Sequence, residues 1–236
     1  MYVKKHIPNA ITCCNLFSGC IACVMAFNGA FDLAMGFIVL GAVFDFFDGM
    51  VARLLRVSSP LGVQMDSLAD DITFGIAPAT IVFNYMNDVL YYPVYLGCFS
   101  EIIPYMAFLI AVFSACRLAK FNVDTRQTNT FIGLPTPANA LFWSSLVTGA
   151  GHWIFNLNAG WVLMIGLILL SSYLLVSEIP MFSLKFKNFS WRCNKTRYVF
   201  LVVALPMLVL GYLAPVAIIA WYLLLSVVLY VKGTRP

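Results

Sequence analysis

The chain has 236 residues, of which 62% are hydrophobic and only 10% are charged, and its formal net charge is +4. A soluble domain carries roughly 25% charged and about 45–50% apolar residues, so this chain cannot cover itself with polar surface in water. The composition excludes a soluble globule, a disordered chain, a collagen-like repeat and a disulfide scaffold. Because the net charge is small, nucleic acid is not expected as a partner.

Apolar runs that approach the length of a bilayer span recur along the whole chain. A helix needs about 20 residues to cross roughly 30 Å of hydrocarbon. The sequence therefore predicts an all-α integral membrane protein, a polytopic bundle of about eight transmembrane helices in a single domain over residues 1–236. The predicted spans are 10–28, 33–54, 64–84, 94–117, 136–154, 160–180, 198–213 and 215–231.

The two ends of this pattern leave alternatives open. The last two runs are short and are separated by the segment from Gly211 to Pro215, which predicts a helical hairpin over 198–231 and leaves counts of six or seven spans possible. The first run resembles the core of a signal peptide, but no small-residue cleavage site with a polar sequence follows it. We therefore interpret it as the first span, with Pro8 in its first turn.

The basic residues predict which ends of the spans face the cytoplasm. All 14 lie at the two termini or in the connections after the second, fourth and sixth spans, and the alternate connections have none. Cytoplasmic loops of membrane proteins retain Lys and Arg. We therefore expect both termini and these connections on the cytoplasmic side, an arrangement that requires an even number of spans.

Acidic residues within the spans are the strongest functional signal, because each Asp near a bilayer centre costs on the order of 2.5–3.5 kcal/mol. Asp45 and Asp48 lie near the cytoplasmic end of the second span, and Asp66 and Asp70 lie near the start of the third. Spacings of three and four residues place each pair on one helix face. The short loop between these spans makes them antiparallel neighbours, so the two acidic faces can meet. Asp71 points about 100° away from Asp70 and is left out of the set.

Four converging carboxylates repel one another, and two divalent cations relieve this repulsion. Hard oxygen ligands favour Mg²⁺, Mn²⁺ or Ca²⁺ over zinc, and Mg²⁺ commonly shares its shell with substrate phosphates. We therefore predict a dinuclear site for Mg²⁺ or Mn²⁺, with Ca²⁺ as an alternative. The competing interpretation pairs the carboxylates with water or with Arg53 and Arg56, and it leaves the spacing unexplained. The predicted metal ligands are Asp45, Asp48, Asp66 and Asp70.

Small residues flank both acidic pairs. Gly49 and Ala52 follow the first pair within about one turn, and Gly62 lies one turn before the second. They leave space between the helices in which a flat ring or a diphosphate can approach the backbone. Arg53 offers a cation for phosphate oxygens.

Read together, residues 45–70 follow the pattern Asp45-x-x-Asp48-Gly49-x-x-Ala52-Arg53, then eight residues, then Gly62-x-x-x-Asp66-x-x-x-Asp70. This pattern resembles the signature of the CDP-alcohol phosphotransferases. The resemblance implies that an alcohol displaces CMP from a CDP-linked substrate at a dinuclear metal site on the cytoplasmic side of the membrane. By this analogy the four Asp residues hold the metals and Asp70 is also the general base. The CDP pocket would be lined by Gly49, Ala52, Arg53 and Gly62.

Further segments resemble the phosphatidylserine synthase branch of this family, and the likeness runs from about residue 7 to residue 187. It implies CDP-diacylglycerol and L-serine as substrates, with phosphatidylserine and CMP as products, in a protein surrounded by membrane lipids. The segments are 67–70 with 74–79, 117–122, 133–138, 176–183 and the opening pattern Pro8-Asn9-x-x-Thr12-x-x-Asn15.

The predicted acceptor pocket follows from the chemistry of serine, a zwitterion that needs a cation for its carboxylate and acceptors for its ammonium group. Arg117 lies at the cytoplasmic end of the fourth span, where it can bind a carboxylate or the lipid phosphate. An ordinary anchor at the membrane surface is the alternative for this residue. The predicted contacts for serine or the lipid phosphate are Arg117, Asn122 and Asn15.

Two other functions compete with serine transfer. A family member with another acceptor, such as glycerol phosphate or inositol phosphate, would carry the same signature. A cation transporter would also place carboxylates in the membrane, but transporter sites usually lie near the midplane on broken helices related by repeats. The carboxylates here gather toward the cytoplasmic helix ends, and no repeat is visible. A homodimer is compatible with all these features.

Overall fold

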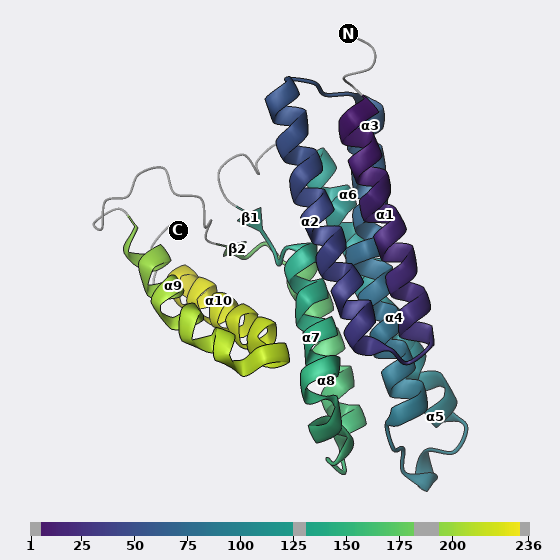
Figure 1. Ribbon diagram of the computed structural model, residues 1–236. Coiled ribbons are helices and arrows are strands. Elements are labelled where there is room, and N and C mark those ends of the chain that lie inside the picture. The colour runs from purple at the N-terminus through teal and green to yellow at the C-terminus, as the bar shows by residue number, and fades with distance from the viewer. Residues whose placement is uncertain (1–5, 125–130, 182–193, 232–236) are drawn as a thin grey trace.

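The computed structural model describes residues 6–124, 131–181 and 194–231. Helices make up most of the described chain, and the long ones pack side by side in an elongated bundle (Figure 1). The predicted all-α class is therefore confirmed.

The first two helices, α1 (His6–Phe27) and α2 (Phe31–Leu55), run antiparallel along one side of the bundle (Figure 1). Gly29 joins them at a φ of +72°, a conformation that glycine adopts without steric cost. Small buried residues such as Ala22 and Ala34 allow the two backbones to approach closely. Asp45 and Asp48 of α2 consequently lie toward its far end, near the start of α1.

The third predicted span is a continuous helical rod whose hydrogen bonding changes along its length. α-helical and π-helical parts alternate, and π-helical turns are frequent at functional sites. The first π-helical part begins directly after Asp70. The apolar run over 64–84 predicts a helix there but does not reveal this change in hydrogen bonding. The parts are α3 (Pro60–Asp70), η2 (Asp71–Ile76), α4 (Ala77–Asn84) and η3 (Tyr85–Val89).

The fourth predicted span, 94–117, is less regular than expected. Its first part consists of short helices around Pro104, which lacks an N–H group and so cannot complete the α-helical hydrogen bonding. The long helix begins only at Leu109, and it continues beyond the predicted end. The parts are η4 (Val94–Leu96), α5 (Phe99–Ile102), η5 (Ile103–Phe108) and α6 (Leu109–Val123).

A two-stranded sheet, which the sequence does not predict, lies beside the fifth and sixth long helices. β1 (Phe131–Ile132) pairs antiparallel with β2 (Pro180–Met181). Gly133 follows β1 at a φ of +75°, so the chain turns sharply before it enters the next helix. The sheet thereby ties the start of one helix to the end of the other. These helices are α7 (Thr136–Phe155) and α8 (Gly160–Val176).

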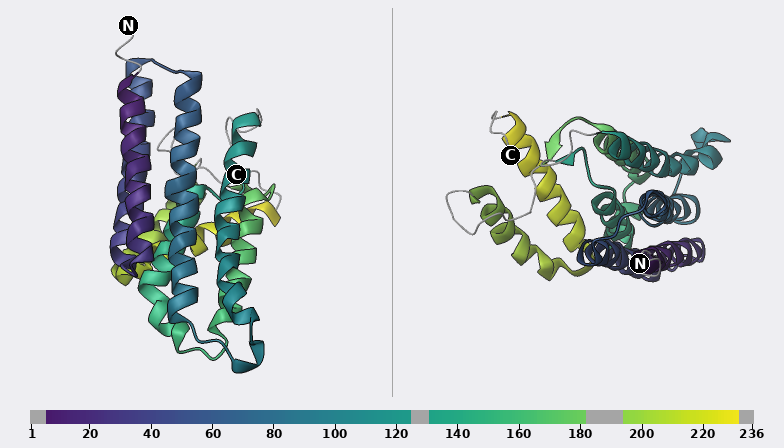
Figure 2. Two further views of the ribbon diagram at one scale, coloured as in Figure 1. Left: turned by 90° about the vertical axis from the view of Figure 1, so that its right-hand side faces the viewer. Right: turned by 90° about the horizontal axis from the view of Figure 1, so that it is seen from above.

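The predicted C-terminal hairpin over 198–231 is present as a pair of helices. α9 (Lys195–Met207) and α10 (Ala214–Val231) are joined by η7 (Leu208–Leu213). The pair lies obliquely beside α7 (Figures 1 and 2). Its tilt distinguishes it from the upright helices of the bundle.

One serine attaches the turn of this hairpin to α7. The Ser145 hydroxyl donates to the carbonyl oxygen of Tyr212 (2.8 Å) and accepts from the N–H group of Val216 (3.2 Å). Gly149, one turn along α7, leaves room for the contact, because a Cβ atom there would lie 2.9 Å from side-chain carbons of Leu213. The hairpin turn therefore meets α7 near the middle of that helix.

The surface of the described chain suits a lipid environment. Four helical segments, 6–27, 31–55, 99–123 and 195–231, are long and apolar enough to cross a membrane, and the last of them contains the turn of the hairpin. Large apolar side chains are exposed on the outside, among them Phe17. Together with the composition, these features identify an integral membrane protein.

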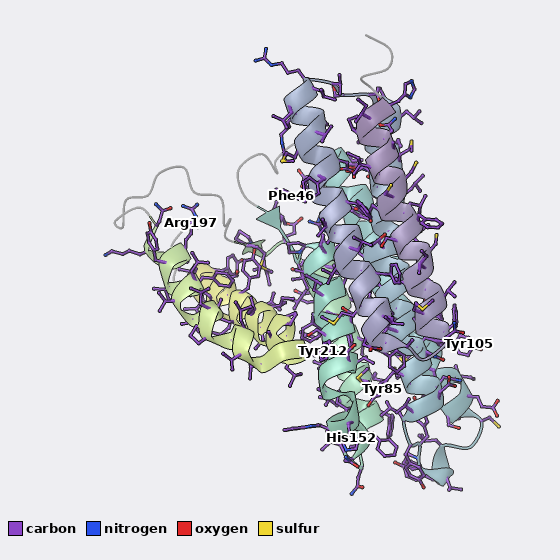
Figure 3. All side chains as sticks on the ribbon, in the orientation of Figure 1. Phe46, Tyr85, Tyr105, His152, Arg197 and Tyr212 are labelled. Atoms are coloured by element: carbon purple, nitrogen blue, oxygen red, sulfur yellow. The ribbon has the colours of Figure 1, made fainter. Side chains whose placement is uncertain are left out.

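The two ends of the bundle differ in chemistry. Figure 3 shows Tyr85 and His152 toward the end where α7 finishes, which is the end remote from the connection between α2 and α3. The four predicted metal ligands lie toward the other end, in the second half of α2 and in α3. The candidate site is therefore confined to one end of the molecule.

Candidate active site

The structure brings three of the four predicted metal ligands into one group. One carboxylate oxygen of each of Asp45, Asp48 and Asp66 lies within 4.8 Å of the others. Asp48 is buried, with 6% of its surface exposed, and the other two are half-buried. The acidic pairs of α2 and α3 thus face one another across the interface between these helices, as their spacing predicts.

Asp70 lies beside this group and not within it. It interacts electrostatically with Asp45, Asp66 and Asp48. Its Oδ1 atom accepts a hydrogen bond from Nδ2 of Asn15 on α1 (3.1 Å). The fourth carboxylate is therefore near the others but has a separate partner.

The donor set fits a divalent cation. In the part of the chain that the structure describes, no Lys or Arg forms an ion pair with these carboxylates, and Oδ1 of Asp66 is buried without a hydrogen-bond partner. An acceptor that is buried without a donor is costly, and clustered anions add their mutual repulsion. Hard divalent ions with oxygen ligands remove both costs. The alternative of ion pairs with Arg53 or Arg56 finds no support in this geometry.

A hydroxyl group of α1 also reaches the metal ligands. The Thr12 hydroxyl donates to Oδ2 of Asp48 (2.6 Å), and the carbonyl oxygen of Pro8 lies 3.1 Å from the same hydroxyl. The shorter bond to a carboxylate oxygen is the stronger of the two. Thr12 was not among the predicted site residues, although it belongs to a pattern of polar residues at every third position of an apolar helix.

A cavity of about 150 Å³ opens next to the carboxylates. It lies where the start of α1, the end of α2 and the start of α3 meet. Gly49, Ala52 and Gly62, three of the predicted CDP-binding residues, line it together with Asp48 and Asp66. The remaining lining residues are Pro8, Asn9, Thr12, Val57, Ser58, Ser59 and Val63.

The cavity wall at Gly62 leaves no space for a side chain. A Cβ atom at this position would lie 2.9 Å from Oδ1 of Asn9 and 3.1 Å from Oγ of Ser59. The Ser59 hydroxyl itself accepts a hydrogen bond from the N–H group of Gly62 (3.0 Å) and caps α3. Any larger residue here must displace one of these polar groups.

The fourth predicted CDP-binding residue lies outside the lining. Arg53 is exposed, and its guanidinium nitrogens lie 3.9 and 4.0 Å from the place that a Cβ atom would take at Gly49. Its cation is therefore next to the cavity, on the same helix as Asp48.

Two of the predicted acceptor residues lie on α6, which packs against η2 directly after Asp70. Arg117 is half-buried, donates to Oγ1 of Thr136 (3.2 Å) and interacts electrostatically with Asp70. Asn122 is exposed and donates to Oγ of Ser67 (2.8 Å).

Asn15 and Asp71 contact other parts of the protein and do not line the cavity. Asn15 is fully buried, at 0% exposure, and its side chain contacts Asp70. Oδ1 of Asp71 would lie 2.8 Å from a Cβ atom at Gly75, where η2 packs against α6. Asp71 thus faces away from the group of three carboxylates.

Comparison with known proteins gives a consistent result. A family model described as CDP-alcohol phosphatidyltransferase matches residues 5–172. The chain is 33% identical over 174 residues to a CDP-diacylglycerol–serine O-phosphatidyltransferase of Helicobacter pylori (strain J99), which covers 73% of this chain and 70% of that protein. It is 36% identical over 137 residues to a protein of the same name from Bacillus subtilis, over 56% of this chain and 70% of that one.

An archaeal protein with a related name is similar as well. The archaetidylserine synthase of Methanothermobacter thermautotrophicus is 33% identical over 141 residues, or 59% of this chain and 56% of that protein. The matched region contains the acidic residues, the cavity and Arg117. Because the family model matches well over half of its residues, the chain belongs to the CDP-alcohol phosphatidyltransferase family.

Proposed function

We propose that this protein transfers the phosphatidyl group from CDP-diacylglycerol to the hydroxyl of L-serine, which gives phosphatidylserine and CMP. The observation that carries the proposal is the group of converging carboxylates beside a cavity, on the residues of the family signature. The names of the relatives from Helicobacter pylori and Bacillus subtilis support serine as the acceptor.

We assign the metal site to Asp45, Asp48, Asp66 and Asp70, with two divalent ions, Mg²⁺ or Mn²⁺, as the expected occupants and Ca²⁺ as an alternative. Such ions, when bound, neutralise the diphosphate and stabilise the departing CMP. The carboxylates supply hard oxygen donors at the interface between two helices.

The cavity suits the CDP head group. Gly49, Ala52 and Gly62 present backbone and small side chains, so a planar base or a diphosphate can lie close to the helices. Asn9 and Ser59 offer polar groups on the same wall. Arg53, next to the cavity, supplies a cation for phosphate oxygens.

We assign the role of general base to Asp70. The serine hydroxyl gives its proton to this carboxylate as its oxygen forms a bond to the phosphorus that carries diacylglycerol. The bond from that phosphorus to the oxygen bridging to CMP breaks, and CMP leaves with the bridging oxygen. A carboxylate is a weak base, so its contribution is local acceptance of a proton that is released as the new bond forms.

Arg117 and Asn122 are proposed to bind the acceptor or the lipid phosphate. Arg117 has no carboxylate partner among the described residues, so its remaining N–H groups are available for the serine carboxylate. Its electrostatic interaction with Asp70 supports a position next to the reacting hydroxyl. Asn122, paired with Ser67, borders the exposed side of this region.

We place the site on the cytoplasmic side of a membrane domain with about eight spans. The distribution of Lys and Arg supports this orientation, since all 14 lie in segments expected on one side. The helices α9 and α10, joined by η7, support the hairpin predicted over 198–213 and 215–231. In this arrangement the acyl chains of CDP-diacylglycerol stay in hydrocarbon while its head group reaches the cavity.

The test is a reconstitution assay with purified protein, CDP-diacylglycerol, Mn²⁺ or Mg²⁺, and labelled L-serine. We expect CMP and labelled phosphatidylserine in equal amounts. Parallel reactions with glycerol phosphate and inositol phosphate measure the competing acceptors. Preferred CMP release with either of these, and little with serine, would contradict the proposal.

A further inference from the structure

Two polar side chains of α1 contact acidic residues of α2 and α3. Thr12 and Asn15, three residues apart, are both buried, at 4% and 0% exposure. Each donates a hydrogen bond to a different carboxylate, Asp48 for Thr12 and Asp70 for Asn15. α1 contributes no acidic residue of its own. It contacts the site by hydrogen bonds to the acidic residues of α2 and α3.

The contact between Asn15 and Asp70 is directional. A carboxylate oxygen only accepts hydrogen bonds, so the amide nitrogen of Asn15 is the atom that faces Oδ1 of Asp70, at 3.1 Å. The other amide atom, Oδ1 of Asn15, is buried and has no hydrogen-bond partner within the described ranges. The side chain therefore keeps one polar atom unsatisfied while it binds the carboxylate.

The backbone around Asn15 is fixed to the same segment. The Thr73 hydroxyl, three residues after Asp70, donates to the main-chain oxygen of Asn15 (3.1 Å). Two glycines make this close approach possible. A Cβ atom at Gly41 would lie 2.9 Å from Oδ1 of Asn15, and one at Gly19 would lie 2.3 Å from Oγ1 of Thr73.

We propose that Asn15 is a positioning residue for Asp70: it holds Oδ1 of the carboxylate and leaves the second oxygen for the reaction centre. This inference rests on the proposed function, because it takes Asp70 as the general base and a metal ligand. Two bonds, one from the side chain and one to the main chain, join Asn15 to the segment that carries Asp70. Without the amide, the carboxylate of Asp70 loses the one hydrogen bond that the described residues give it.

The chain offers a matched control in Asn84 of α4. Asn84 is also buried (6% exposed), and its Nδ2 donates to the carbonyl oxygens of Ala26 (2.7 Å) and Phe27 (3.2 Å) at the other end of α1. The same substitution at either position removes an amide that binds another helix. Of these two asparagines, only Asn15 bonds to an acidic residue of the site among the described residues.

The experiment compares Asn15→Leu with Asn84→Leu in purified, reconstituted protein. For Asn15→Leu we expect kcat for CMP release to fall about 10–100-fold, with the KM values for serine and CDP-diacylglycerol changed less than about 3-fold. We expect Asn84→Leu to keep kcat within about 3-fold of wild type, whatever it does to the thermal midpoint. Asn15→Ala, which removes the amide without adding a branched group, serves if Asn15→Leu does not fold.

A second readout needs no turnover. Binding of Mn²⁺ to the substrate-free protein, followed by the paramagnetic resonance of free Mn²⁺, should weaken about 10–100-fold in the Asn15 variants and not in Asn84→Leu. Equal losses in both variants, or a raised KM for serine at unchanged kcat, would overturn the positioning role. If the wild-type protein releases no CMP with serine, the proposed function fails, and the Mn²⁺ titration still decides the role of Asn15.

Discussion

At the scale of single residues, the signature residues differ in how tightly the fold constrains them. Asp48 is buried and bonded to Thr12, whereas Arg53 is exposed at the edge of the cavity. Asp70 has its own partner in Asn15. These differences lead to distinct expectations for substitution.

Asp70→Asn should leave the protein folded and abolish serine-dependent CMP release. The amide keeps the size of the side chain but accepts no proton and is a poorer metal ligand, so we expect a loss of at least about 100-fold in kcat. The assay is CMP release by protein that elutes as wild type does in size-exclusion chromatography. Full activity in this variant would refute the assignment of Asp70 as the base.

Gly62→Ala should weaken CDP-diacylglycerol binding selectively. The new Cβ atom must displace Asn9 or Ser59, at a cost of about 1–3 kcal/mol, so we expect the KM for CDP-diacylglycerol to rise about 10-fold and the KM for serine to stay constant. Gly36→Ala is the control, because no other described residue beyond its own helical turn lies within 4 Å of its Cβ position. Equal KM values in both variants would exclude Gly62 from the CDP pocket.

Arg117→Ala should raise the KM for serine, or for the lipid if its phosphate is the ligand. Hydrogen bonds to charged groups contribute about 1.5–3 kcal/mol, so the expected rise is roughly 10–100-fold. Lys120→Ala removes the same charge from the same helix, where Lys120 forms a surface ion pair with Glu178 (3.4 Å). If Arg117→Ala changes the KM values no more than Lys120→Ala does, Arg117 is an ordinary membrane anchor.

At the scale of elements, the helix boundaries were largely predictable and the internal geometry was not. Apolar run length located α1, α2, α7 and the hairpin to within a few residues, because the bilayer fixes the length of a span. The π-helical turn of η2 and the strand pair β1 and β2 depend on contacts between distant segments, such as the bond from Thr73 to Asn15. No local periodicity encodes such contacts.

The same distinction holds for the site. The spacing of Asp45, Asp48 and Asp66 predicted their convergence, because helix periodicity and a short loop determine it. The hydrogen bonds from Thr12 to Asp48 and from Asn15 to Asp70 were not predictable, since they depend on how α1 packs against the acidic helices. The sequence predicted only that Asn15 contacts serine or the lipid phosphate, and it placed both residues in the opening pattern Pro8-Asn9-x-x-Thr12-x-x-Asn15.

Ser145→Ala should loosen the C-terminal hairpin without affecting the chemistry. It leaves the carbonyl oxygen of Tyr212 and the N–H group of Val216 without their partner, at an expected cost of about 0.5–2 kcal/mol. Thermal unfolding in detergent measures the loss. Ser226→Ala is the control, because its hydroxyl bonds only within its own helix. Equal thermal midpoints in the two variants would contradict an anchoring role for Ser145.

At the scale of the whole molecule, the bundle separates a reactive end from an apolar body. The carboxylates and the cavity lie toward the end where α2 meets α3, and exposed apolar side chains cover the long helices. Such an arrangement allows a lipid substrate to remain in the membrane while its head group reaches an aqueous acceptor. The distribution of basic residues along the sequence agrees with this polarity.

The most direct measurement is CMP release from CDP-diacylglycerol and serine before and after exhaustive chelation. If Asp45, Asp48, Asp66 and Asp70 hold divalent ions, turnover should cease in the chelated protein and return on addition of Mn²⁺ or Mg²⁺. The variant Asp66→Asn should require a higher concentration of the ion for the same recovery. Turnover that persists in the metal-free protein would contradict the account.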